Sequence, residues 1–487
     1  MIWKIAKKEF LLNLMTFKFA VGTIVCMVLT AVFIPILAKD YQQKLRTYND
    51  NVARNEAELR KVKVYKNITP TIYRPPSVLS VFSEGLEKQI ANSAKIEYDR
   101  IPEISAAAGQ ENPYQAIFPV FDASLIFKIV IGVLALLVAY DAISAERERG
   151  TLKLMLSDTI ARHEVLLAKL LAGLLVLVVP TTITFTIGLI ILLSFPMVDL
   201  TPSAWVRVGL MYLASLLFIS AMYNLGLLVS CLTRRSAISL VLGLFIWIVF
   251  VVVVPNGSIY LAERVQPLEP EDKIDGQIKS LQQAYKSEFN KSKPRRTNTS
   301  VSDSSGAFGH FYSRKINKEG LEYFKEIYRL EHTLGIKYAD KLWEVEHSYL
   351  NGLSKQKKLA HNLSRISPIS LYENLMSSLA GTGIAGFQSY IMSVKTYRDR
   401  LIDYVRFRTD GFSATSLFTP FTIEQMEHLP NKSEDPSLDL RDLPRFTLKA
   451  DVVVDLRKAI PDLVLLIFAN VLFFALAFVA FVRYDVR

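Results

Sequence analysis

The side chains best suited to metal binding or nucleophilic catalysis are few in this 487-residue chain, which has six histidines and two cysteines. No two histidines have the i, i+4 spacing that presents two imidazoles to one metal on a helix. Glu346 and His347 fall on a charged helix face, where solvated side chains are expected rather than ligands. Cys26 and Cys231 fall in or beside apolar runs and predict small buried side chains. These residues predict neither a metal site nor catalysis.

Motifs that hold nucleotides or activate nucleophiles are also absent from the sequence. It contains no G-x-x-x-x-G-K-[ST] phosphate loop, no H-E-x-x-H and no G-x-S-x-G. We therefore expect no enzymatic activity and no cofactor in this chain.

The charged residues of the apolar runs are positioned unlike those of ion-driven carriers, which place titratable groups inside the bilayer. Here they lie near the ends of the runs: Lys128, Asp141, Lys169, Arg207 and Asp462. The deeper polar residues are neutral and suit helix packing: Ser215, Ser220, Asn224 and Asn470. This pattern disfavours a proton- or sodium-driven carrier, so the energy for any transport must come from elsewhere.

A charged connection follows the second apolar run. The helix of that run is predicted to extend into the charged segment, to break at Gly150, and to be followed by a short helix with Leu152, Met155 and Leu156. Glu164 stands where a first-turn carboxylate favours the next helix. Such an amphipathic elbow can dock on a cytoplasmic partner and transmit a push, or it can be an ordinary loop on the membrane surface. The residues alone leave both readings open.

Six uninterrupted apolar runs are long enough to cross a bilayer as helices, each of which takes roughly 20 apolar residues. They predict spans at residues 19–38, 124–140, 164–193, 205–231, 238–254 and 461–482. Because 51% of the residues are hydrophobic and gather in these runs, the fold class is a mainly α polytopic membrane protein. The short connections on one side carry lysines and arginines, whereas the short loop 194–204 on the other side has none. By the positive-inside rule the N- and C-termini are cytoplasmic.

Two long polar insertions, residues 39–123 and 255–460, are then predicted as largely helical extracytoplasmic domains. The first begins with charge-dense sequence free of helix breakers, which predicts that the first span continues out of the membrane as a helix. The second has apolar residues in a three-four rhythm from Leu321 to Tyr349, typical of a long helix packed along one stripe. Residues 1–18 also carry an apolar stripe, which fits either a helix lying in the inner interface or a cytoplasmic extension of the first span.

Segment 141–163 and its surroundings contain E-R-x-x-G-T-L-x-L-x-L-S followed by R-x-E-x-L-L-x-K, which closely resembles the coupling region of type-2 ABC transporter permeases. Residues 7–10 resemble the family's N-terminal interfacial helix, and residues 228–237 resemble its turn between the fourth and fifth spans. The large insertions resemble a bacterial subgroup, and Ala161 departs from the serine that often caps the following helix. In the family this elbow sits in a cleft of the ATP-binding subunit. The resemblance therefore implies contact with an ATPase by Glu146, Arg147, Glu148, Arg149, Gly150, Thr151, Leu152, Leu154, Met155, Leu156, Arg162 and Glu164.

The resemblance further implies a permease subunit of an ATP-driven ABC transporter in a bacterial inner membrane. ATP and Mg²⁺ would be bound by partner ATPase subunits, and a second permease, identical or homologous, would pair with this one among the membrane lipids. Without intramembrane charges, export of an amphipathic or lipid-linked cargo fits better than ion transport. Two alternatives stay open: motion passed to an outer protein partner without cargo, or a membrane receptor or scaffold. Nucleic acid is not expected, because the net charge of +11 does not come from one basic tract.

Overall fold

The computed structural model describes residues 2–87, 91–105, 122–152, 161–198, 200–294, 318–413, 416–417, 437–448 and 452–483. Its α-helices are α1 (Ile2–Leu14), α2 (Phe17–Leu59), α4 (Ala123–Leu125), α5 (Gly132–Ala139), α6 (Ser144–Glu148), α8 (Arg162–Leu193), α9 (Pro202–Leu232), α10 (Ser236–Ile248), α11 (Val254–Val265), α12 (Glu271–Ser292), α13 (Lys318–Ser364), α14 (Pro368–Ala380), α15 (Ile384–Arg408) and α18 (Val452–Val482). Its strands are β1 (Thr71–Tyr73), β2 (Ser93–Lys95) and β3 (Glu103–Ser105). Short 3₁₀ or π-helical turns are η1 (Tyr65–Asn67), η2 (Val78–Val81), η3 (Ile126–Ile131) and η4 (Val249–Val253).

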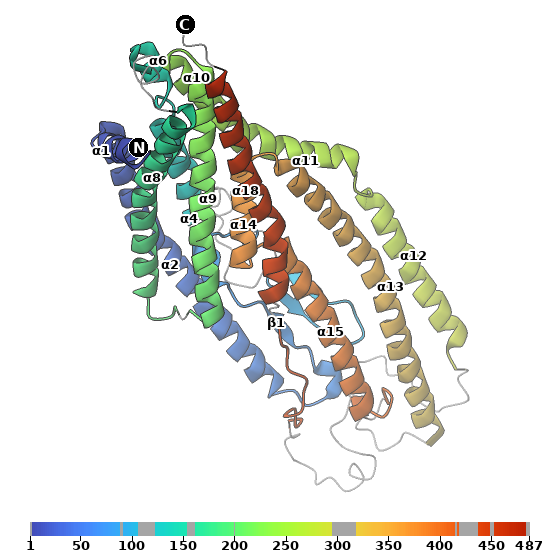
Figure 1. Cartoon of the computed structure of the whole chain (residues 1–487). Helices are drawn as coiled ribbons and strands as arrows, with labels where there is room; N and C mark the ends of the chain where they lie inside the picture. The colour runs from blue at the N-terminus through green and yellow to red at the C-terminus, as the bar shows by residue number, and fades with distance from the viewer. Residues whose placement is uncertain are drawn as a thin grey trace.

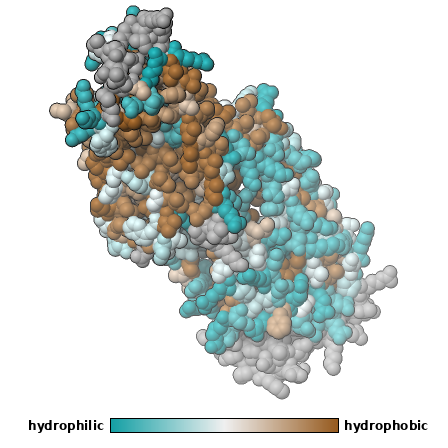
Figure 2. Space-filling view, viewed as in Figure 1, coloured by the Kyte–Doolittle hydropathy of each residue, from teal (hydrophilic) through white to brown (hydrophobic). Residues whose placement is uncertain are grey.

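Within the described residues, six helices are long and apolar enough to cross a membrane. They cover Phe17–Leu59, Ala123–Glu148, Arg162–Leu193, Pro202–Leu232, Ser236–Val265 and Leu456–Val482. Each contains one of the predicted apolar runs, so the mainly α, polytopic membrane fold is confirmed. Figure 2 shows these helices as a hydrophobic band, with hydrophilic surface covering most of the part that holds the insertions. We call the end that carries α6 the elbow end, and the opposite end, where the insertions lie, the far end (Figure 1).

Helix α9 lies among the other spans and packs against α5, α14 and α18 (Figure 1). Small residues allow this close packing: a Cβ on Gly226 of α9 would come within 2.6 Å of the Ala139 Cβ on α5. Deeper in the bundle, the Asn224 amide of α9 donates to Asn470 Oδ1 of α18 at 3.1 Å. These two neutral side chains therefore hold helices together, as the sequence predicts for them.

Helix α1 is separate from the first span, because the backbone leaves the helical conformation at Met15 and Thr16 before α2 begins. It packs along α8, with Ala6 buried beside Ala168 and Ala172. Three alanines at the contact let the two helices approach closely. Of the two readings of residues 1–18, a continuous extension of the first span is therefore wrong.

Two spans continue as helices beyond their predicted ends. Helix α2 has 43 residues, which at 1.5 Å per residue is about 65 Å, roughly twice the bilayer's hydrocarbon thickness. This confirms the predicted helical continuation of the first span. The fifth span runs from α10 through η4 into α11 and ends at Val265 rather than at the predicted residue 254. Pro255 does not stop it; this proline comes just after the π-helical turn η4, where the regular i→i−4 bonding is already interrupted.

The two insertions share one hydrophobic core at the far end. The first contributes a short antiparallel sheet in the order β1-β2-β3, with Ile72 opposite Ala94 and Ala94 opposite Ile104. The second contributes α15, whose Tyr390 and Val394 are buried in the same cluster as Ile72 and Ala94. The sequence analysis did not anticipate this sheet, because its three-residue strands are too short to give an alternating pattern.

An ionic cluster also ties the first insertion to α13. The Asp99 carboxylate lies 3.0 Å from His332 Nδ1 on α13 and accepts a hydrogen bond from Lys66. Burial alone would raise the pKa of Asp99, but the hydrogen bond with His332 and the charge of Lys66 outweigh it. The pKa of Asp99 is consequently held well below its usual range.

Helix α14 belongs to the second insertion but packs inside the membrane bundle. Its Tyr372 stacks on Phe218 of α9 with ring centroids 4.6 Å apart, and its hydroxyl lies 3.1 Å from Ser215 Oγ. Ser215 lies about 15 Å along α9 from the predicted start of that span at residue 205, near the middle of a bilayer core of roughly 30 Å. The sequence analysis placed these residues with the far-end insertion, because thirteen residues are too few to read as a span.

Candidate coupling site

The elbow is built at the point where the second span ends. Helix α5 ends at Ala139, a turn follows, and α6 begins at Ser144. Ser230 Oγ of α9 accepts hydrogen bonds from the backbone N–H groups of both Ile143 and Ser144, each at 2.9 Å. These are backbone donors that a helix N-terminus otherwise leaves without partners. The start of α6 is thereby fixed to α9.

The tip of the elbow is exposed. Glu148, Arg149, Gly150 and Thr151 are all exposed, whereas Leu152 is fully buried beneath them. Gly150 ends α6 with φ +75°, a left-handed conformation that glycine adopts without the steric cost of a side chain. A Cβ at this position would meet nothing within 4 Å. Glycine is therefore favoured at position 150 by its backbone conformation, and not because a larger side chain would clash. The helix break predicted at this residue is present.

A buried lysine connects the elbow to two other helices. Lys169 of α8 is 3% exposed, and its Nζ donates to Glu146 Oε1 of α6 at 2.7 Å and to Glu9 Oε1 of α1 at 3.1 Å. In a site of low dielectric constant, one ammonium between two carboxylates gives short charge-assisted hydrogen bonds. Lys169 therefore joins α1, α6 and α8 at one point.

The other side of α6 is bound to the turn between α9 and α10. The Arg147 guanidinium donates to the Thr233 carbonyl oxygen at 2.8 Å. The Glu148 carboxylate accepts from both the backbone N–H and the hydroxyl of Ser236, at 3.0 and 2.9 Å. The fourth and fifth spans therefore meet the elbow at its charged residues.

The second half of the predicted site lies at the start of α8. The Arg162 guanidinium donates to the Val482 carbonyl oxygen, near the last turn of α18, at 2.6 Å. Glu164 lies in the first turn of α8, as the sequence predicts, and Ala161 at the N-cap provides no side-chain cap. Leu154, Met155 and Leu156 lie outside the described residues.

The described elbow residues thus form one unit, in which an exposed tip stands on a base connected to the third, fourth, fifth and sixth spans and to α1. The candidate residues Glu146, Arg147 and Glu148 bind inward, and Arg149, Gly150 and Thr151 face outward. The sequence analysis placed Lys169 in the second part of the coupling motif, but it counted neither Lys169 nor Glu9 among the residues expected to contact the ATPase. In the described part of the chain no group of three or more histidine, cysteine or carboxylate side chains could hold a metal ion. Because its inward-facing residues are bonded to several helices, the elbow can carry force between its tip and the spans.

Comparison with curated proteins found no match. The family model described as ABC-2 family transporter protein matches residues 3–486, nearly the whole chain. This extent covers the six spans, the elbow and both insertions together. The chain therefore belongs to the ABC-2 transporter family, whose members are membrane components of ABC transporters.

Proposed function

We propose that this chain is the permease subunit of an ATP-driven ABC transporter of a bacterial inner membrane, with the elbow as the docking site of a separate ATPase. The observation that supports this most is the combination of an exposed tip, residues 148–151, with a base tied to α1, α8 and α9. A loop that merely lay on the membrane surface would not need three ion-pair and hydrogen-bond anchors on different helices. Closure of the ATPases would push on the tip, and the anchors would pass the push to the spans.

Two permeases, identical or homologous, would pair to enclose the path, since six spans are few for a translocation route. Inside the bundle the contact between Asn224 and Asn470 is neutral, and the charge of Lys128 in the second span is paired with Glu373 of α14. The buried charges near the elbow end are compensated locally, as Lys169 is by two glutamates. These features support an amphipathic or lipid-linked cargo, moved outward, in preference to a small ion.

A second candidate function is mechanical transmission to an outer partner without cargo. The specific observation in its favour is that α2 leaves the hydrophobic band as one 43-residue helix and reaches the insertions. A stiff helix of this kind would carry motion outward. ATP-dependent movement of a labelled amphiphile in proteoliposomes separates the two functions: export requires it, and pure transmission predicts none.

Docking of the ATPase is tested by co-purification with its ATP-binding subunit, which we expect a neighbouring gene to encode. Leu152 is a poor test residue, because it is fully buried and a charge there would disrupt the elbow itself. We instead expect Arg149→Glu, which reverses an exposed charge, to weaken ATPase binding by about tenfold or more, equivalent to about 1.4 kcal/mol. The control is Lys279→Glu, the same reversal on the exposed surface of α12 at the far end, which should leave binding unchanged.

Gly150 provides a second, matched pair of variants. Gly150→Val forces a β-branched residue into a left-handed conformation, which costs roughly 1–2 kcal/mol or more. Gly150→Asn is tolerated there, because asparagine is among the residues that adopt this conformation most readily. We expect the valine variant to lose ATPase binding while the asparagine variant keeps it, with both eluting as monodisperse protein. Equal binding by both variants, together with an unaffected Arg149→Glu variant, contradicts docking at this elbow.

A further inference from the structure

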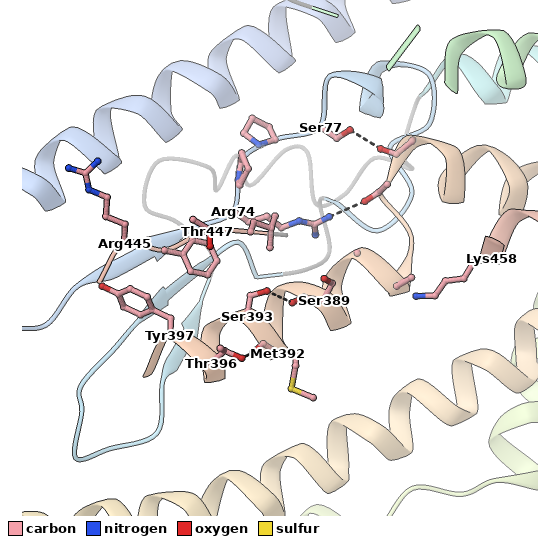
Figure 3. A pocket seen from close by; sticks show the side chains of 18 of the residues that line it. Arg74, Ser77, Ser389, Met392, Ser393, Thr396, Tyr397, Arg445, Thr447 and Lys458 are labelled. Carbon is pink, nitrogen blue, oxygen red and sulfur yellow. Dashed lines mark hydrogen bonds between the residues drawn. The ribbon is translucent and has the colours of Figure 1, made fainter. Parts of the chain in front are cut away.

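A pocket of about 560 Å³ lies at the far end of the membrane bundle. It is formed where the loop 74–77 of the first insertion meets α9, the end of α14, α15, residues 445–448 and the start of α18. Figure 3 shows Arg74 near the middle of the pocket, with Arg445 and Lys458 at opposite ends. Five of the lining side chains are cations: Arg74, Arg207, Arg400, Arg445 and Lys458. None of the lining residues, all of which are described, is acidic.

Two of the arginines converge on one turn. Gly381 ends α14 in a left-handed conformation, with φ +73°. Arg74 donates from Nη2 to its carbonyl oxygen at 3.1 Å, and Nη1 of Arg207 lies 3.7 Å from the place where a Cβ of Gly381 would stand. In a partly buried site such like charges repel one another more than they would in water. Negative charge supplied near this turn would relieve that repulsion.

Arg207 also has an unused donor. Its Nε is buried and has no hydrogen-bond partner among the described residues. A buried guanidinium N–H without an acceptor is costly, because it has lost water and gained nothing in exchange. The planar guanidinium matches phosphate and carboxylate oxygens, so an anion in the pocket would satisfy this donor.

The N-terminus of α15 adds positive potential to the same wall. This 25-residue helix begins beside the pocket, and its N-cap, Gly383, has no side chain to cap the first turn. Free backbone N–H groups and the helix dipole favour an anion at such an end. The hydroxyls of Ser393 and Thr396 line the pocket too, but they donate to carbonyl oxygens of their own helix, at 2.8 and 2.9 Å. Recognition therefore depends on the cations and the helix end.

A buried carboxyl group, that of Glu87, stands outside the pocket lining. Glu87 stands behind the loop and accepts the Ser77 N–H at 3.1 Å. Burial raises the pKa of Glu87, against the lowering effect of Lys44 and Arg74. It therefore neutralises Arg74 less than an exposed carboxylate would.

The pocket is level with the far boundary of the bilayer. Arg207 lies in the second turn of α9, and Lys458 precedes the predicted start of the sixth span at residue 461. Met392 and Phe446 add apolar lining beside the cations. A site with a cationic wall, some apolar surface and this position suits the head of an anionic amphiphile.

We propose that this pocket is a binding site for a phosphate or carboxylate group, carried by a lipid headgroup or by a soluble anion. Arg74 and Arg207 hold the anion from two sides, with the first turn of α15 facing it. The site is separate from the elbow and goes beyond the proposed function, because it requires no ATPase.

The test uses the purified full-length chain in an uncharged detergent, without ATPase, and measures binding calorimetrically. The probes are dihexanoyl-phosphatidylglycerol, dihexanoyl-phosphatidylcholine and inorganic phosphate. We expect saturable binding of the phosphatidylglycerol, weakened roughly tenfold or more by Arg207→Gln and by Arg74→Gln. The control is Arg264→Gln on α11, a cation outside the pocket, which should bind as the unaltered chain does.

The probes also identify the source of the anion. Binding of phosphate with the same dependence on Arg207 supports the site and indicates a soluble anion, whereas binding of the phosphatidylglycerol alone supports the site and indicates a headgroup. The proposal is overturned when neither anionic probe saturates, when the phosphatidylcholine binds equally well, or when both arginine variants bind as the unaltered chain does. Arg207→Gln removes no hydrogen bond found in the described structure, so its loss of binding cannot be assigned to misfolding when its melting temperature is unchanged. Since no ATPase is present, failure here leaves the elbow proposal untouched.

Discussion

Lys169 is the residue whose replacement tests most directly whether the elbow is held as a rigid unit. Its ammonium joins Glu146 of the elbow to Glu9 of α1, and it is 3% exposed. We consider Lys169→Met, which keeps the length and the apolar stem of the side chain and removes the charge. The substitution leaves Glu9 and Glu146 facing one another without a cation. Glu146 already has one buried oxygen, Oε2, without a hydrogen-bond partner among the described residues.

The size of the effect follows from burial. Removing one partner of a buried ion pair costs about 3–5 kcal/mol, because the remaining charge stays desolvated. The two glutamates are 22% and 19% exposed, so that water relieves part of this cost. We therefore expect Lys169→Met to lower the free energy of unfolding by about 3 kcal/mol. Glu146→Gln should cost about 1–2 kcal/mol, because Lys169 keeps Glu9.

A double-mutant cycle separates the bridge from simple packing. If Lys169 and Glu146 are coupled, the double variant loses less than the sum of the single losses, by about 1–2 kcal/mol. Unfolding is followed by tryptophan fluorescence during titration with SDS in mixed micelles. The matched control is Lys18→Met, which breaks the more exposed ion pair with Asp141, where about 1 kcal/mol or less is expected. Strictly additive losses, or a Lys169→Met variant as stable as the control, refute the reasoning.

Two further predictions concern the bundle and the far end. Gly173→Ala places a Cβ 2.0 Å from Cζ of the buried Tyr223 ring, so we expect a loss of about 1–3 kcal/mol in the same SDS titration; Gly209→Ala on α9, with open space around its Cβ, should be neutral or slightly stabilising. Because the folded-state pKa of Asp99 is held below its unfolded value, its contribution to stability is complete above about pH 4 and is lost as the pH falls through the folded-state pKa. The difference in unfolding free energy between the unaltered chain and Asp99→Asn should accordingly be constant near neutrality and shrink below about pH 4; a difference that grows as the pH falls contradicts this sign.

The spans, the long first helix and the break at Gly150 could be predicted because each is a local property of the sequence. A long apolar run must cross the bilayer or be buried inside the protein, and a charge-dense run without helix breakers extends a helix. The exposure of the elbow tip follows from its polarity in the same way. The structure confirms the helix break at Gly150 and the exposure of residues 148–151, whereas contact of residues 146–151 with an ATPase stays a prediction.

The partners of those residues could not be predicted, because they are distant along the chain. Lys169 stands near the end of a span, where a lysine usually reaches toward water. Instead it is buried between Glu146 and Glu9, which is 160 residues away. Spacing rules do not encode such pairings. For the same reason the packing of α14 against α9 and α18 was not predicted. It depends on the contact between Tyr372 and Phe218, which are far apart in the sequence and share no local pattern.

Helix α9 connects the two sites described above. At the elbow end it provides Ser230, which fixes the start of α6, and in its second turn at the far end it carries Arg207. Its 31 residues make a rod of about 46 Å, and packing against α5, α14 and α18 leaves it little freedom to bend. A tilt of about 5° pivoted at the elbow would move the far turn by about 4 Å, more than the reach of a hydrogen bond. A push on the elbow that tilts α9 relative to α14 would therefore change the geometry of Arg207 against the Gly381 turn. Comparing the anion affinity of the pocket with and without bound ATPase measures whether this connection is used, since equal affinities show that the two sites act independently.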